Sequence, residues 1–299
     1  MTIRFIDCSP FIEALIRENG IDVSDVTIHV GDPSAEDLAK VIGGARVVIN
    51  GHTVIDGPMM ERCPDLRSIV FLGTGAASYI DVAAAARLGI AVHTVKGYGD
   101  RSIAEHAFAL ALAAARNIPR MDRDLRVGIW NPLEGMELKS RTMGVIGAGG
   151  IGTEMAAIAR GFGMRVLLWN RTPRPELADI QTDLETLLGE SDIVSLHLSL
   201  SEETRGFLAA PQFALMKRGA ILVNTARGAI VNQADLLAAL ASGETVAHAA
   251  LDVFDTEPLD PASPLLAQPN VTLSAHAAFK TREAADRLVR TGIELARRS

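Results

Sequence analysis

The feature that most restricts the fold of this 299-residue chain is a glycine-rich turn between an apolar segment and a helix-like segment. The apolar segment 142–146 runs directly into Gly-Ala-Gly-Gly-Ile-Gly at 147–152, and a helical pattern follows. In a strand–turn–helix unit, Gly147 permits the tight turn, Gly149 lets the backbone approach a pyrophosphate, and Gly152 allows close packing of helix on strand. The helix N-terminus adds unpaired N–H groups and a positive dipole end. This segment therefore predicts a dinucleotide-binding unit.

Short apolar segments alternate with helix-like segments along the whole chain. The predicted strands are 3–8, 26–30, 46–50, 66–72 and 91–95 in the first part, and 142–146, 165–169, 193–198, 220–225, 247–254 and 271–275 in the second. Aromatic residues make up only 4% of the chain, so aliphatic side chains have to fill the interior, as in parallel sheets covered by helices. The predicted fold class is α/β, with two doubly wound parallel-sheet domains, one flavodoxin-like and one of the Rossmann type.

The length of the chain fits two domains. We expect residues 99–276 to form the Rossmann domain, and residues 1–98 together with 277–299 to form a discontinuous substrate domain, with the active-site cleft between the two. A helix beginning at the capping-box pattern 102–105 is apolar nearly all round, so it should be buried within the chain or between chains. The region 101–117 is the predicted surface of a homodimer.

Charge and hydropathy exclude several classes of function. The net charge of −7, without any basic block, argues against nucleic acid or an anionic membrane as a partner. The longest apolar run, 107–115, is about half a membrane span, and no signal-peptide pattern opens the sequence, so we expect a cytoplasmic protein. The histidines do not fall into a metal-ligand spacing, and no metal site is predicted.

The residues after the second strand of the Rossmann pattern bear on the choice of cofactor. An NAD-binding unit usually carries an acidic residue about 20 positions beyond the glycine turn, where it binds the ribose hydroxyls. This chain has Asn170 and Arg171 there, with Arg174 just beyond. Asn170 does not repel a 2′-phosphate, and Arg171 can clamp one through two hydrogen bonds. The sequence favours NADP over NAD, and NAD remains the alternative.

Three polar residues follow the later predicted strands, at the sheet edge where open α/β sheets bind ligands. They are Arg227, Glu257 and His276. Hydride transfer between a carbinol carbon and a nicotinamide needs a group that moves the hydroxyl proton, and histidine suits this role near neutral pH. A neighbouring carboxylate favours the protonated ring, and an arginine binds a substrate carboxylate in a two-point fork. The set predicts oxidation or reduction of a 2-hydroxy or 2-keto acid.

The order of these motifs resembles the D-isomer-specific 2-hydroxyacid dehydrogenases over most of the chain. The shared segments are 80–85 with 89–90, 102–106, 128–130, 147–152, 224–228, 251–254 with 257–258, and His276. The resemblance implies that Arg227 binds the substrate carboxylate, that His276 is the acid/base, and that Glu257 is its partner. It also implies that Asp252 lies near the nicotinamide. Backbone amides around Thr74, Gly75 and Ala76 are implied to hold the substrate carboxylate, and family members are usually dimers.

The predicted sites can be given residue by residue. The dinucleotide site comprises Gly147, Gly149, Gly150, Ile151, Gly152, Asn170, Arg171, Thr172, His197, Thr225, Ala226 and Asp252; the substrate site comprises Thr74, Gly75, Ala76, Arg227 and His276. Gly150 departs from the larger, often basic residue of many family members, whereas residues 170–172 resemble the NADP-using glyoxylate and hydroxypyruvate reductases. His106 is expected to be a hydrogen-bonded packing residue, and Trp130 and Trp169 are expected to be packing residues.

The resulting hypothesis is an NADP-preferring, D-specific reductase of a small 2-keto acid, with glyoxylate or hydroxypyruvate favoured. A first alternative is an NAD-dependent enzyme of the same fold with another substrate, such as formate or phosphite. A second alternative is a dinucleotide-sensing interaction protein with little catalysis.

Overall fold

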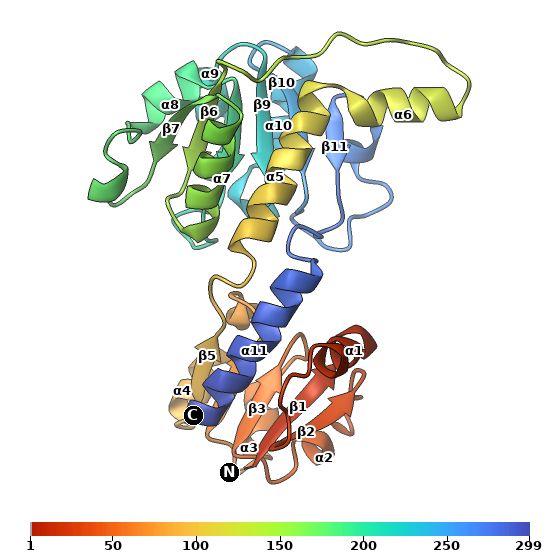
Figure 1. Cartoon of the computed structure of the whole chain (residues 1–299), viewed down its shortest axis with the longest axis vertical. Coiled ribbons are helices and arrows are strands. Elements are labelled where there is room, and N and C mark those ends of the chain that lie inside the picture. Colours follow the sequence, from red (N-terminus) through yellow and green to blue (C-terminus); the bar gives the residue numbers. More distant parts are fainter. Residues whose placement is uncertain (1) are drawn as a thin grey trace. The chain divides into compact units, whose positions relative to one another are not determined.

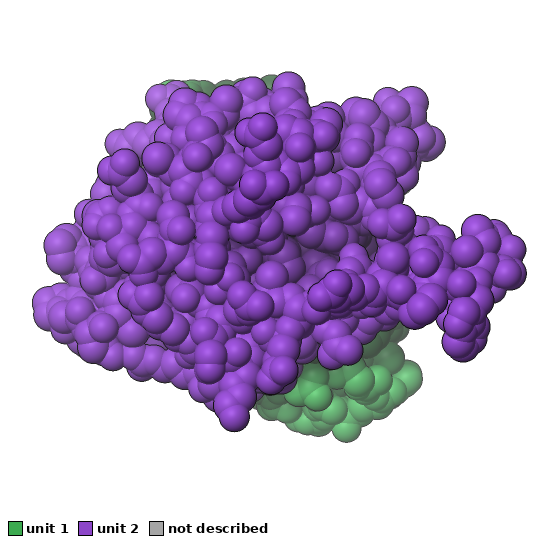
Figure 2. All heavy atoms as spheres, turned by 90° about the horizontal axis from the view of Figure 1, so that it is seen from above, with its two compact units in different colours: residues 1–99, 280–299 green, residues 100–279 purple. Residues whose placement is uncertain are grey.

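The structure is a computed structural model that describes residues 2–299. Residue contacts divide the chain into two compact units, which Figure 2 shows in different colours. Unit 1 comprises residues 1–99 and 280–299, and unit 2 comprises residues 100–279. The sequence places the domain boundaries after residues 98 and 276, and the contacts place the unit boundaries after residues 99 and 279.

Unit 1 contains a five-stranded parallel sheet in the order β2-β1-β3-β4-β5. Its strands are β1 (Ile3–Cys8), β2 (Val26–Val30), β3 (Val47–Asn50), β4 (Ser68–Phe71) and β5 (Ala91–Thr94). Its helices are α1 (Pro10–Glu18), α2 (Leu38–Ile42), α3 (Gly57–Glu61), α4 (Val82–Arg87) and α11 (Arg282–Arg298). This strand order is that of the flavodoxin-like doubly wound sheet, as predicted.

The C-terminal helix α11 completes the core of unit 1. Thr281 caps its N-terminus, because the Thr281 side chain accepts a hydrogen bond from the Ala284 N–H at 3.1 Å. Val289 and Ile293 are buried on its inner side and join the hydrophobic core formed with β1 and α1. The helix contacts β3, β4 and α1, as can be followed in Figure 1. Unit 1 is thus built from the two ends of the chain.

Unit 2 contains a six-stranded parallel sheet in the order β11-β10-β9-β8-β6-β7. Its strands are β6 (Thr142–Ile146), β7 (Arg165–Trp169), β8 (Ile193–Leu196), β9 (Ala220–Asn224), β10 (Val246–Leu251) and β11 (Val271–Leu273). Its helices are α5 (Asp100–Ala115), α6 (Ile118–Arg126), α7 (Gly150–Gly161), α8 (Leu184–Glu190), α9 (Ala210–Leu215) and α10 (Gln233–Ser242). The order reverses between β6 and β8, the kind of position where doubly wound sheets bind ligands.

Several predicted strands of unit 2 are too long. The predictions 193–198, 247–254 and 271–275 extend beyond the observed ends at Leu196, Leu251 and Leu273. Strand ends depend on where neighbouring strands stop pairing: the last pair between β10 and β11 joins Leu251 to Leu273. An apolar run in one strand carries no information about the length of its neighbour. The residues beyond these ends form the loops that carry the candidate site.

The apolar helix α5 is buried by its own unit. Its inner residues, such as Ala104, Phe108 and Ala111, pack in one hydrophobic core with α7 and the sheet. Figure 1 shows α5 running alongside α7, and it also contacts β9, β10 and β11. One side of α5 is therefore buried within the chain itself, whereas Ala109, Leu112 and Ala113 stay exposed or partly exposed.

The segment after α5 exposes apolar side chains. Asn117 adopts a left-handed conformation with φ of 53°, which ends α5, and α6 then begins with Pro119 in its first turn. No residue of α6 is buried, and Figure 1 shows the helix projecting from the body of unit 2. Trp130 is 85% exposed, so its assignment as a packing residue within this chain was wrong. Trp169, in contrast, packs against Phe207 with ring centroids 5.3 Å apart.

Across residues 2–299, no helix combines the length and apolar character needed to cross a membrane.

Candidate active site

The glycine turn between β6 and α7 requires its glycines for different reasons. Gly147 has φ of +107°, and a side chain there would lie 2.5 Å from the His197 carbonyl oxygen. A Cβ at Gly152 would lie only 1.9 Å from the Gly147 carbonyl oxygen. Among residues 2–299, no atom outside Gly149 and its two chain neighbours lies within 4 Å of the Cβ position at Gly149, the N-cap of α7. The turn is therefore closed where it packs on the sheet and open where a ligand would approach.

Gly150 has a close neighbour that the sequence does not reveal. A Cβ at this position would lie 1.7 Å from Asp100 Oδ2, on the first residue of α5. Because this carboxylate is the far end of a flexible side chain, a larger residue at position 150 would require the Asp100 side chain to move rather than the backbone. The Asp100 carboxylate thus lies close to the positive N-terminal end of α7.

The end of β7 is tied directly to the glycine turn. Asn170 Oδ1 accepts a hydrogen bond from the Ala148 N–H at 3.0 Å, and Asn170 Nδ2 donates to the Thr172 carbonyl at 2.7 Å. Arg174 Nη1 donates to the Ala148 carbonyl at 2.9 Å. Arg171 instead forms an exposed ion pair with Glu203. The geometry therefore brings Arg174, rather than Arg171, into contact with the turn.

Arg227 and His276 follow strands of the same parallel sheet. Arg227 lies just beyond β9 and His276 just beyond β11, and both strands flank β10. Because parallel strands end at the same edge, both residues belong to the carboxyl edge of unit 2. The loop of Arg227 is held by Asn224, whose Nδ2 donates to the Arg227 carbonyl at 2.9 Å. Arg227 Nη1 donates to the Ala226 carbonyl at 2.6 Å, which orients the guanidinium.

His276 is paired with Glu257. The distance between His276 Nδ1 and Glu257 Oε2 is 2.6 Å, and Glu257 Oε1 accepts from the Phe254 N–H at 2.9 Å. An ionised carboxylate only accepts hydrogen bonds, so Nδ1 carries the proton in this pair. The other ring nitrogen, Nε2, is then the atom suited to exchange a proton with a substrate. The Phe279 ring lies edge-on to the imidazole, with centroids 5.8 Å apart.

Asp252 is the buried centre of the loop that carries His276. Its side chain is fully buried, and it accepts hydrogen bonds from Ser274 Oγ at 2.6 Å and from the N–H groups of Ala277 and Ala278 at 2.9 and 3.0 Å. Burial alone would raise the pKa of this carboxyl, but the hydrogen bonds around it outweigh that effect and lower the pKa to about 2. Asp252 is therefore a carboxylate at neutral pH.

Three further predicted residues border the glycine turn and β9. The His197 N–H donates to the Ile146 carbonyl at 2.8 Å, and its ring Nε2 lies 2.9 Å from Ser195 Oγ. Burial lowers the pKa of His197 to about 4, so the ring is neutral. Thr225 follows β9 and is buried, and its Oγ1 lacks a hydrogen-bond partner among residues 2–299. Ala226 is the next residue and separates Thr225 from Arg227.

The predicted contacts from unit 1 lie beyond β4. Thr74 is exposed, Gly75 is partly exposed, and Ala76 is buried and begins a short 3₁₀ turn, Ala76–Ser78. They occupy the loop at the carboxyl end of β4, the edge at which a sheet of this type binds ligands.

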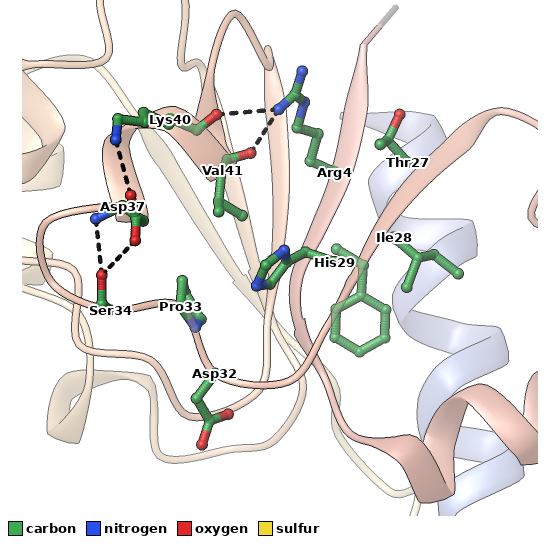
Figure 3. Close-up of a pocket in the computed structure, with 11 residues that line it drawn as sticks. Arg4, Thr27, Ile28, His29, Asp32, Pro33, Ser34, Asp37, Lys40 and Val41 are labelled. Atoms are coloured by element: carbon green, nitrogen blue, oxygen red, sulfur yellow. Dashed lines mark hydrogen bonds and ion pairs between the residues drawn. The ribbon is translucent and has the colours of Figure 1, made fainter.

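Unit 1 also holds a cavity of about 530 Å³ between β1, β2 and α2 (Figure 3). None of the predicted site residues lines it. Arg4 Nη1 donates to the Val41 carbonyl at 2.8 Å and so caps the end of α2, while Lys40 pairs with Asp37 at 2.9 Å. These charged side chains bind groups of α2 and its N-terminus, and we assign this cavity no role in the candidate site.

Comparison with known proteins agrees with this geometry. Residues 108–278 match the family model described as "D-isomer specific 2-hydroxyacid dehydrogenase, NAD binding domain". The chain belongs to this family. It is 43% identical over 242 residues to a glyoxylate reductase of Aeropyrum pernix, covering 77% of this chain and 72% of that protein. Other relatives are named hydroxypyruvate reductase. The predicted family and enzyme class, an oxidoreductase, are confirmed.

Two further comparisons concern length and fold. A D-3-phosphoglycerate dehydrogenase of Archaeoglobus fulgidus is 38% identical over 275 residues, which are 90% of this chain but only 51% of that protein. The chain thus spans about half the length of that relative. A crystal structure of a protein from Thermus thermophilus superposes with a TM-score of 0.84 at 34% identity, covering 98% of this chain and 94% of the other. The predicted α/β fold class is thereby confirmed.

Proposed function

We propose that this family member is an NADP-preferring, D-specific reductase of a small 2-keto acid, with glyoxylate or hydroxypyruvate as substrate. The observation that carries the proposal is the 2.6 Å pair between His276 and Glu257, on the carboxyl edge of the sheet that bears the glycine turn. In this proposal, unit 2 is the dinucleotide-binding domain and unit 1 is the substrate domain. Relatives named glyoxylate reductase and hydroxypyruvate reductase support the choice of substrate.

The residues of unit 2 fit a dinucleotide. The open backbone at Gly149 leaves room for a pyrophosphate at the N-terminus of α7, and the buried Thr225 hydroxyl still needs a hydrogen-bond partner. The proposed cofactor contacts are Gly147, Gly149, Gly150, Ile151, Gly152, Asn170, Arg171, Thr172, His197, Thr225, Ala226 and Asp252. When bound, the reduced nicotinamide supplies the hydride.

The chain's own residues supply the substrate contacts and the proton. Arg227 binds the substrate carboxylate and polarises the neighbouring carbonyl group, because its guanidinium offers several N–H groups in one plane. In unit 1, the backbone N–H groups of Thr74, Gly75 and Ala76 are proposed to bind the same carboxylate. His276 Nε2 gives its proton to the carbonyl oxygen as the carbon receives the hydride, and the product is the hydroxy acid. Glu257 stabilises the protonated ring before the transfer and orients it throughout.

A panel of substrates and cofactors tests the proposal. We expect initial rates to be highest with NADPH and glyoxylate or hydroxypyruvate, and lower with pyruvate, phenylpyruvate or NADH. A faster rate with NADH would contradict the assigned cofactor. Oxidation of formate or phosphite with NAD⁺, without reduction of any keto acid, would favour another enzyme of the same fold. Tight cofactor binding without any turnover would favour a sensing protein.

Arginine residues near the glycine turn are proposed to bind the 2′-phosphate of NADP. Arg174 already contacts the turn through the Ala148 carbonyl. Arg171 forms an ion pair with Glu203, and the 2′-phosphate would have to replace Glu203 as its partner. We expect alanine at either position to raise KM for NADPH about 10- to 100-fold, the usual range for a lost hydrogen bond to a charged group, and to leave KM for NADH unchanged. Arg160→Ala, which removes another exposed ion-paired arginine of unit 2, is the matched control. Equal losses with both cofactors would contradict a 2′-phosphate contact.

We also propose a homodimer through the predicted region 101–117 and the segment that follows it. One side of α5 packs on α7 and the sheet of its own unit, whereas Ala109 is exposed and Leu112 and Ala113 are partly exposed. Larger exposed apolar side chains lie just beyond, at Ile118, Leu125, Val127, Ile129 and Trp130. Sedimentation equilibrium of the wild type and of Trp130→Glu tests this contact, since a charge in a buried apolar contact should shift the wild-type dimer toward monomer.

A further inference from the structure

The loop that carries His276 is held in an unusual backbone conformation. His276 has φ of +48°, in the left-handed region that residues other than glycine rarely adopt. Such a conformation persists only where surrounding contacts enforce it. Here the His276 N–H donates to the Asp252 carbonyl at 2.8 Å, and the next two N–H groups donate to the Asp252 carboxylate. Asp252 therefore fixes the backbone on the C-terminal side of His276.

A second set of contacts fixes the other side of His276. Ser274 Oγ donates to Asp252 Oδ1 at 2.6 Å, and the Ser274 N–H donates to the Leu251 carbonyl at 2.9 Å. Since the carboxylate can only accept, the Ser274 hydroxyl proton points toward Asp252. The Ser274 oxygen keeps its lone pairs for a donor from another direction.

That donor comes from α5. His106 Nε2 lies 3.0 Å from Ser274 Oγ and 3.4 Å from Asp252 Oδ1. Because the Ser274 proton is committed to Asp252, His106 Nε2 must be the protonated nitrogen of this contact. The hydrogen bonds therefore run in one direction, from His106 to Ser274 and from Ser274 to Asp252, with His106 also donating toward Asp252 directly. They anchor the His276 loop to a helix that is itself buried against α7 and the sheet.

From this chain of contacts we propose that His106 and Ser274 are positioning residues that hold the His276 ring in its reactive orientation through Asp252. Neither residue needs to touch the substrate. His106 fixes the rotamer of Ser274, Ser274 fixes one oxygen of Asp252, and Asp252 fixes the backbone that aims His276 Nε2. The inference rests on the proposed role of His276 as the acid/base.

Matched substitutions test this arrangement. Ser274→Thr keeps the hydroxyl, whereas Ser274→Val has the shape of threonine without the hydroxyl. His106→Gln keeps an N–H donor, whereas His106→Leu does not. We expect kcat to fall at least about 10-fold in the Val and Leu variants and to stay near the wild-type value in the Thr and Gln variants, as for loss of one buried hydrogen bond. KM for glyoxylate and Kd for NADPH should be unchanged in all four. The double variant Ser274→Val/His106→Leu should lose no more activity than the worse single variant.

A readout independent of turnover separates this inference from the proposed function. The imidazole NMR signal of His276, assigned by its loss in His276→Asn, should be single and narrow in the wild type and broadened or split in Ser274→Val. Wild-type kcat and an unchanged signal in Ser274→Val and His106→Leu would overturn the positioning role, as would losses that multiply in the double variant. Full activity in His276→Asn would instead overturn the proposed acid/base. Thermal unfolding of each variant shows whether an activity loss reflects global instability.

Discussion

Exchanging His276 for asparagine is expected to lower kcat for glyoxylate reduction by about 100- to 10,000-fold, the usual contribution of a general acid. Asparagine can still donate a hydrogen bond toward Glu257, but it cannot release a proton to the carbonyl oxygen of glyoxylate at neutral pH. Hydride transfer would then leave an alkoxide without its proton donor. The loss should fall on kcat, whereas Kd for NADPH, measured by nicotinamide fluorescence, should stay unchanged.

Two further variants serve as a test of the His276 partner and as a control. Glu257→Gln should give a smaller loss, because the amide oxygen still accepts from His276 Nδ1 but no longer stabilises the charged ring. His29→Asn removes a partly exposed histidine of unit 1 that belongs to none of the proposed sites, and it should leave kcat unchanged. A His276→Asn enzyme with wild-type turnover would exclude His276 as the acid.

Exchanging Gly152 for alanine is expected to weaken NADPH binding by about 100-fold or more, equivalent to about 2.7 kcal/mol. The added Cβ would lie 1.9 Å from the Gly147 carbonyl oxygen, which belongs to the backbone of the turn and cannot rotate away. Either α7 or the turn has to shift, and the N–H groups of the helix N-terminus would then lose their placement toward the pyrophosphate. Isothermal titration of NADPH into both proteins measures the change.

The same helix offers a matched control. Gly161 ends α7, and in the described part of the chain no atom outside its neighbours and the backbone of α7 lies within 4 Å of its Cβ position. Gly161→Ala should therefore leave NADPH binding unchanged and lower the entropy of the unfolded chain slightly. If Gly152→Ala bound NADPH as tightly as Gly161→Ala, close packing of α7 on the glycine turn would not matter for the cofactor.

Much of the fold could be predicted because its determinants are local. The strands β6 and β7 were predicted with their observed ends, since apolar runs there stop at glycine, asparagine or charged residues that favour turns. The glycine turn was also predictable, because turn conformation and close packing depend on residues a few positions apart. The helix α6 was missed although Ile118, Met121 and Leu125 recur at helical spacing, because the segment is short and these side chains do not face a core.

The site could be predicted only as a set of residue types. Arg227, Glu257 and His276 could be predicted from the sequence, because strand ends in one parallel sheet share an edge. It could not show that Arg171 pairs with Glu203 while Arg174 contacts Ala148, since side-chain direction depends on neighbours distant in sequence. Nor could it show that large apolar side chains are exposed just beyond α5, as at Trp130.

By itself, then, the sequence determined the alternating α/β architecture, the dinucleotide-type turn and the family, because each depends on short-range patterns of apolar, glycine and polar residues. Only the tertiary structure decided which side chains meet. His106 on α5 meets Ser274 after β11, and both surround Asp252 after β10, although each comes from a different part of the chain. Such contacts form when separate elements pack into one core, and hydrogen bonds of buried groups then select a single arrangement.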